Sequence, residues 1–234
     1  MVRLRRLRRT EAIRNMFAMD RPSRDRFIWP VFLVEGIGRK EPIDSMPGQF
    51  RWSVDRLVAE FPKGVRSVLL FGQTEGEKDE VGLSAADPRG VVQQAIPVLK
   101  RAFPDLVVIT DVCLCAYTSH GHCGPRDADG DVDNDAACEM LARVAVSHAM
   151  AGADGVAPSA MMDGQIAAIR AALDGEGLSK TLLISYSTKF ASTMYGPFRD
   201  AENSAPSSGD RQGYQASYRD PDTAVRESVV DEAE

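Results

Sequence analysis

The sequence predicts an α/β protein built around a parallel sheet. Five short runs of apolar and β-branched residues alternate with segments whose apolar residues recur at helical spacing. A strand, a helix and a further strand in regular alternation favour right-handed crossovers and therefore parallel strands. In such a sheet, functional residues lie at the carboxyl ends of the strands.

Each predicted strand is short, apolar and bounded by Gly, Pro or polar residues. Pro30, inside the first of them, indicates an irregular start because proline cannot donate a backbone hydrogen bond. The five predicted strands are 27–34, 67–71, 106–109, 154–159 and 181–189.

The predicted helices follow these strands and carry recognisable terminal signals. Pro88 lies near the first turn of one helix, Asp133 caps another, and Gly152 ends that same helix. Residues 39–51 read as a loop. Residues 196–221, rich in Gly, Pro, Ser and Arg, read as a functional lid or a disordered segment. The predicted helices are 53–61, 88–103, 133–151, 164–173 and a last one from residue 221.

The composition is that of an ordinary globular protein, with 234 residues, 44% hydrophobic residues and a net charge of −6. No apolar run approaches the ~18 residues of a membrane span, and no signal peptide is recognisable, so a cytoplasmic location is expected. Three of the four cysteines fall within eleven residues. This clustering favours metal binding over a disulfide framework.

The first 26 residues form a basic arm with nine Arg and three acidic residues. Such a segment is compatible with nucleic acid, but the remaining chain carries a charge of −12 and would repel phosphates. The alternative is an arm that packs on an acidic neighbouring subunit. We expect neither a nucleic acid nor a membrane partner.

Residues 111–124 hold the strongest candidate site. Asp111, Cys113 and Cys115 leave one face of a strand if the extended backbone persists, and Cys123 returns from a glycine-rich loop. Three thiolates that leave one position open are typical of a catalytic metal. His120 or His122 could complete the shell or support it from outside. The alternative is three buried thiols without a metal.

Lys189 ends the fifth predicted strand and is a candidate Schiff-base lysine. The alternative is a lysine that simply points to solvent. Arg199 and Arg211 lie in the predicted lid, where a guanidinium group suits a substrate carboxylate, although solvated arginines are common there.

These stretches, in this order, resemble the porphobilinogen synthases, also called 5-aminolevulinate dehydratases. The most specific matches are Asp-Val-Cys-Leu-Cys with His-Gly-His-Cys-Gly, and Tyr-Ser-Thr-Lys-Phe-Ala-Ser with Tyr-Gly-Pro-Phe-Arg. The resemblance implies a (β/α)8 TIM barrel at residues 27–234, here limited to about five βα units, with a lid over about residues 190–220. It also implies that residues 1–26 form an amino-terminal arm for subunit contacts in a homo-oligomer, an octamer in the family.

The resemblance further implies a hydro-lyase that condenses two 5-aminolevulinate molecules to porphobilinogen, an early step of tetrapyrrole and haem biosynthesis. Cys113, Cys115 and Cys123 match zinc ligands, Lys189 matches a Schiff-base lysine, and Asp111 matches a proton acceptor. The match extends to substrate-binding positions and an allosteric magnesium ligand: Arg199, Arg211 and Ser159 for substrate, and Glu227 for magnesium.

The resemblance also implies a second Schiff-base lysine, in a Met-Val-Lys-Pro motif, beyond Glu234. We therefore expect a truncated form of the enzyme whose 234 residues alone make no porphobilinogen. One alternative is a catalytically inactive, zinc-binding remnant that acts at most as an interaction partner of full-length subunits. A generic Schiff-base aldolase is a further alternative, but it would not need three clustered thiols.

Overall fold

The computed structural model describes residues 3–18 and 23–234. A seven-stranded sheet forms its centre, in the order β2-β3-β1-β4-β5-β6-β7. All neighbouring strands are parallel except β2 and β3. The strands are β1 (Ile28–Leu33), β2 (Lys40–Pro42), β3 (Phe50–Trp52), β4 (Ser67–Gly72), β5 (Val107–Val112), β6 (Gly155–Pro158) and β7 (Leu182–Leu183).

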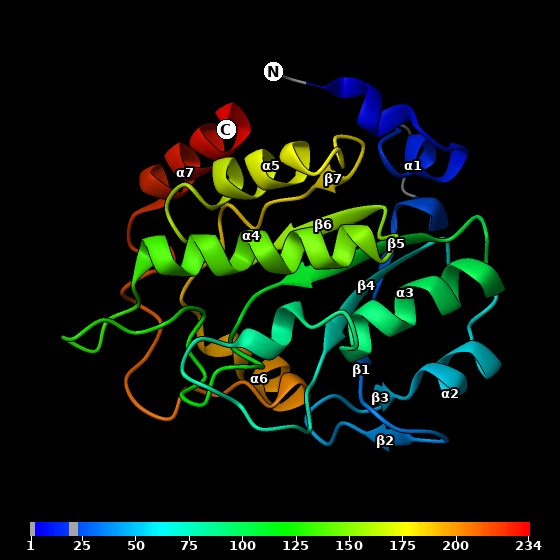
Figure 1. Cartoon of the computed structure of the whole chain (residues 1–234), viewed down its shortest axis with the longest axis horizontal. Coiled ribbons are helices and arrows are strands. Elements are labelled where there is room, and N and C mark those ends of the chain that lie inside the picture. Colours follow the sequence, from blue (N-terminus) through cyan, green and yellow to red (C-terminus); the bar gives the residue numbers. More distant parts are fainter. Residues whose placement is uncertain (1–2, 19–22) are drawn as a thin grey trace.

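Helices that alternate with the strands cover the sheet, as Figure 1 shows. The sheet is open, with β2 at one edge and β7 at the other. The α-helices are α1 (Glu11–Met16), α2 (Val54–Ala59), α3 (Val91–Ala102), α4 (Asn134–Met150), α5 (Gln165–Gly175), α6 (Gly196–Glu202) and α7 (Pro221–Ala233). Within the described ranges, no helix has the length and apolar character needed to cross a membrane.

Alternation along β5 separates two apolar layers. Val108 packs with the layer that faces α2 and α3, whereas Val107 and Ile109 pack on the opposite face. Asp111 has the same parity as Val107 and Ile109. The carboxylate at the end of this strand therefore belongs to the face that a closed barrel would enclose.

The main strands and helices confirm the predicted alternation, but the region 39–51 is not a simple loop. It contains β2 and β3, and β3 pairs in parallel with β1. With only the five predicted strands, the first strand would be an edge of the sheet, but β3 covers that edge of β1. The edge strand β2 has only three residues, includes Pro42, and so offers little surface for pairing with another chain.

The fifth predicted strand is much shorter than expected. Residues 181–189 contribute only the two residues of β7, although Ile184 N still donates to Val156 O of β6 at 2.9 Å. Tyr186 N donates to Pro158 O and Lys189 N to Tyr186 O. Lys189 therefore lies on a turn beyond the strand, not at its tip.

The arm contributes to the core of its own chain, in addition to the subunit contacts that the sequence predicts for it. Ile13 of α1 is fully buried and packs with Val107, Ile109, Ala157 and Leu182. The helix thus covers the amino-terminal end of the inner sheet face. Residues 1–2 and 19–22 of the predicted arm lie outside the described residues.

A buried carboxylate also ties the arm to the sheet. Asp154 accepts hydrogen bonds from Arg9 Nη2 at 2.5 Å, Lys100 Nζ at 2.8 Å and Val108 N at 2.9 Å. Its side chain is buried, so these donors compensate the loss of hydration.

Replacing Asp154 by alanine should lower the free energy of unfolding by about 2–3 kcal/mol, because a buried backbone donor and a partly buried ammonium group lose their acceptor. Urea unfolding followed by circular dichroism measures this. Asp174→Ala is the matched control, because Asp174 is partly exposed and pairs with Arg6 and Arg170. Such pairs contribute less than about 1 kcal/mol. Equal losses in both variants would contradict the argument.

Candidate active site

Three cysteines converge where the sequence analysis expected them. The sulfurs of Cys113, Cys115 and Cys123 all lie within 4.8 Å of one another, and Cys113 and Cys115 are 3.4 Å apart. All three side chains are buried. The fourth thiol, Cys138 on α4, instead donates to the carbonyl of Asp163 at 3.4 Å. We call the first three the thiol cluster.

A glycine lets the returning loop bring Cys123 to the cluster. Gly121 has a φ of +73°, and an added Cβ would lie 2.5 Å from the carbonyl oxygen of Ala205. Both the backbone conformation and the close approach of the lid therefore require glycine. Ser207 N also donates to His120 O at 3.0 Å, which joins the lid to the same loop.

The thiols are protonated at neutral pH when no cation is present. A hydrogen bond with Cys113 lowers the pKa of Cys123, but the bond with Cys115 and burial raise it more, to about 11. The pKa values of Cys113 and Cys115 are raised further. Cation binding must therefore release protons. Three soft donors at this separation fit zinc.

Lys189 points into the same site. The residue is 6% exposed, and its ammonium group donates to the carbonyl of Ser159 at 2.8 Å. Burial lowers the pKa of Lys189, but the nearby Cys113, Cys123 and Asp111 raise it more, so the net shift is upward. The solvent-exposed alternative for this lysine is wrong.

Two carboxyl groups share the site, Asp111 partly buried and Glu202 buried. Burial raises the pKa of Asp111 to about 6, although Lys189 opposes the shift. Burial and the charge of Asp111 together raise the pKa of Glu202 to about 8. The two acids therefore ionise at different pH, as a proton donor and a proton acceptor require. Asp111 Oδ1 has no hydrogen-bond partner among the described residues.

The two predicted lid arginines differ in their surroundings. Arg211 is buried, and its Nη2 donates to Gly121 O at 3.1 Å and Ser204 O at 2.6 Å. It thereby holds the lid against the thiol-bearing loop. Arg199 lies on α6, and its Nε has no partner within the described part of the chain.

Neither histidine belongs to the thiol cluster. His120 has Glu80 O at 3.1 Å from Nε2 and accepts from His122 N at Nδ1. Both ring nitrogens of His122 are also occupied, by the Tyr214 hydroxyl at 3.1 Å and by Ser208 O at 3.0 Å. The sequence left two roles open for these histidines, as a metal ligand or as support from outside the coordination shell. Their contacts fit the supporting role.

Glu227 lies apart from this site, on α7. Burial and the charges of Asp163 and Asp231 raise its pKa, and its Oε2 has no partner among the described residues. The geometry neither joins this acid to the thiol cluster nor tests its predicted role.

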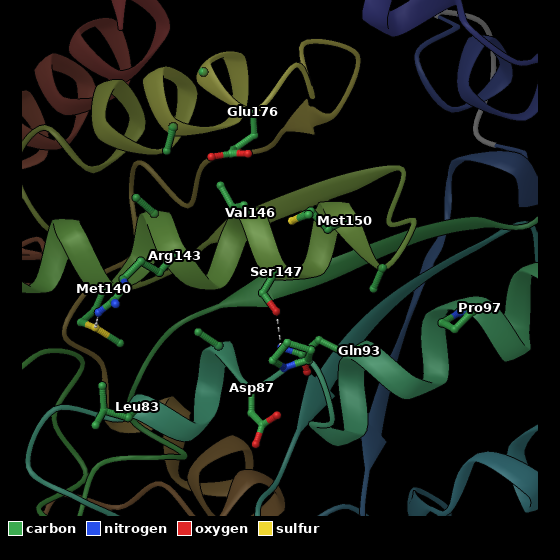
Figure 2. Close-up of a pocket in the computed structure, with 16 residues that line it drawn as sticks. Leu83, Asp87, Gln93, Pro97, Met140, Arg143, Val146, Ser147, Met150 and Glu176 are labelled. Carbon is green, nitrogen blue, oxygen red and sulfur yellow. Dashed lines mark hydrogen bonds between the residues drawn. The ribbon is translucent and has the colours of Figure 1, made fainter.

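A hollow of about 990 Å³ lies elsewhere, among the outer helices. Figure 2 shows that Gln93 of α3, Ser147 of α4 and Glu176, directly after α5, are among the residues that line it. Gln93 Nε2 donates to the Ser147 hydroxyl at 3.1 Å. None of the candidate residues lines this hollow, so it is not part of the active site.

The site contains one acid that the sequence analysis did not single out. Glu202 is at the end of a short helix in a polar segment, where a glutamate is ordinarily solvated. Neither a motif nor a periodic pattern distinguishes it. Only the folding of α6 over the thiol cluster places it inside.

Comparison with known proteins gives consistent matches. The family model described as delta-aminolevulinic acid dehydratase matches residues 1–234. The chain is 51% identical to the delta-aminolevulinic acid dehydratase of Methanothermobacter thermautotrophicus, over 98% of this chain and 71% of that protein. The protein of the same name from Ruminiclostridium josui is 47% identical, over 85% of this chain and 98% of its own length.

A solved structure is similar as well. It is the delta-aminolevulinic acid dehydratase (porphobilinogen synthase) of Toxoplasma gondii ME49, in complex with the reaction product porphobilinogen. The TM-score is 0.88 at 37% identity, and the match covers all of this chain and 68% of that one. The predicted fold class is therefore confirmed.

Proposed function

The chain belongs to the delta-aminolevulinic acid dehydratase family, and we propose that its Lys189 binds 5-aminolevulinate as a Schiff base beside a zinc ion held by the thiol cluster. The family's reaction is the synthesis of porphobilinogen. The observation that carries the proposal is the convergence of a buried amine and three buried thiols in one site. An aldolase would need only the amine.

Lys189 would supply the covalent step. Its neutral amine adds to the ketone carbon of the substrate, and the carbinolamine then loses water, so that a C=N bond replaces the C=O bond. Asp111 would accept and return the protons, because its raised pKa of about 6 lies near neutral pH. The Ser159 carbonyl orients the amine before the substrate arrives.

Cys113, Cys115 and Cys123 would hold the zinc ion. When bound, such a cation polarises a carbonyl oxygen as a Lewis acid. The fit rests on three buried sulfurs within 4.8 Å of one another and on the soft character of thiolates.

Arg199, Arg211 and Ser159 would bind the substrate carboxylate and position its carbon chain. Arg199 supports this best, because its Nε has no partner and a guanidinium group binds a carboxylate in a bidentate manner. Arg211 already donates to two backbone carbonyls, so we assign it chiefly the closure of the lid.

Further features of the proposal rest on the family alone. Glu227, close to Asp163 and Asp231, would contribute to an allosteric magnesium site. The arm would contact neighbouring subunits of a homo-oligomer, an octamer in the family, and the enzyme would act in the cytoplasm. The comparisons do not favour the inactive remnant, since they match the enzyme family over nearly the whole chain.

Borohydride trapping tests the proposal without requiring turnover. The protein is incubated with 5-aminolevulinate, reduced with borohydride, digested and mapped by mass spectrometry. We expect one reduced adduct, on Lys189. Lys180 is the internal control, because it lies in an exposed part of the chain. A lack of adduct on Lys189, or equal labelling of Lys180, would refute the assignment.

A further inference from the structure

A buried carboxylate contacts the thiol cluster from the lid side. Glu202 Oε2 lies 3.8 Å from the sulfur of Cys115, and the side chain is only 3% exposed. No lysine or arginine within the described ranges forms an ion pair with Glu202. Without a cation, the carboxyl group contacts the Cys115 thiol, which donates to its Oε2, and a bound cation would take the place of the thiol proton.

Hydrogen bonds from Arg51 and Gln73 hold the main chain of the helix that carries Glu202. Arg51 Nε donates to Ala201 O at 2.8 Å and Arg51 Nη2 to Asp200 O at 2.5 Å. Gln73 Nε2 donates to the same Ala201 carbonyl. The backbone next to Glu202 therefore cannot easily retreat, and its side chain stays directed at the cluster.

The spacing suits a shared cation. In a tetrahedral zinc site, a thiolate sulfur and a carboxylate oxygen lie about 3.5 Å apart, given bonds of about 2.3 and 2.0 Å. The observed 3.8 Å is close to this value. Glu202 is not within 4.8 Å of every sulfur in the cluster, so a turn about its side-chain bonds is needed to reach the common centre. A glutamate has enough rotatable bonds for this.

We propose that Glu202 is the fourth protein ligand of the cation held by Cys113, Cys115 and Cys123. This inference rests on the proposed zinc centre and extends it. A Cys3Glu set fills the tetrahedral shell with protein atoms, so a substrate oxygen must displace the carboxylate or enlarge the shell to five ligands. The carboxylate would thus hold the cation tightly between turnovers and yield its place to the substrate.

The test measures metal binding, not activity. Zinc affinity is determined by competition with a chelating dye for the wild type, Glu202→Gln, Glu202→Ala and the control Asp200→Asn. Asp200 lies on the same helix but is exposed and bonds to the Ser45 hydroxyl. Cadmium NMR of the same proteins reports the ligand set. Circular dichroism without metal verifies folding, and the glutamine variant preserves the shape of the side chain.

We expect both Glu202 variants to bind zinc at least about 10- to 100-fold more weakly and to shift the cadmium resonance, with Asp200→Asn unchanged. Unchanged affinity in the Glu202 variants would overturn the inference. Weaker binding with an unchanged resonance would place the carboxylate outside the coordination sphere and also overturn it. Failure of the wild type to bind zinc would instead refute the proposed centre itself.

Discussion

Replacing Cys123 by serine should lower zinc affinity at least about 1,000-fold, because a zinc ion held by few protein ligands depends on each thiolate. The serine hydroxyl remains protonated and is a poor ligand at neutral pH. The side chain is fully buried, but serine nearly matches the volume of cysteine, so folding should be preserved. Competition with a chelating dye measures the affinity.

The chain offers its own control for this substitution. Cys138 is a buried thiol outside the cluster, and its sulfur bonds to a backbone carbonyl. Cys138→Ser should therefore retain the wild-type affinity. Equal losses in the two variants would indicate a general effect of removing a thiol, and retention of binding by Cys123→Ser would show that the cluster is not the zinc site.

Lys189→Met should eliminate the borohydride-trapped adduct with 5-aminolevulinate, because the amine that forms the Schiff base is removed. Methionine keeps the length of the side chain and is compatible with a buried position, but it has no nucleophile. Lys180→Met, at an exposed lysine, is the matched control. A Lys189→Met protein that still forms the adduct would show that another amine attacks the substrate.

The pKa of Lys189 adds a pH dependence to this prediction. Without a cation, Cys113, Cys123 and Asp111 raise its pKa above the ordinary value, so the amine is mostly protonated at neutral pH. Since only the neutral amine attacks, trapping in metal-free protein should increase as pH rises towards the ordinary lysine pKa of about 10.4. Trapping that is independent of pH in this range would contradict the raised pKa.

Much of the fold follows from local patterns in the sequence. The apolar run around Val107 and the capping residue Asp133 identify β5 and the start of α4, and Asp133 does accept from Ala136 N at 3.0 Å. The pair β2 and β3 does not follow, because Lys40, Glu41 and Pro42 show no apolar alternation. Their pairing depends on the neighbouring strand β1, which lies outside the segment.

The site was predictable only where a chemical motif was present. The three cysteines stand out by their clustering and Lys189 by its place in a family motif, and they reach the same site although Lys189 lies on a turn beyond the strand. Glu202 and Ile13 do not stand out, because an acid on a lid and an isoleucine in a basic arm are both ordinary. Their roles come from tertiary contacts, with the thiol cluster for Glu202 and with the inner sheet face for Ile13.

The bonds that fix α6 have a consequence for which substitutions this part of the chain tolerates. Arg51 and Gln73 donate hydrogen bonds to main-chain oxygens of Asp200 and Ala201. Those oxygens are present whatever side chains occupy the two positions. These hydrogen bonds therefore fix the position of α6 but do not depend on which side chains occupy positions 200 and 201. The main-chain bonds hold position 202 beside the sulfurs. A single substitution at position 202 can therefore change the chemical group that faces the thiol cluster while the helix stays in place.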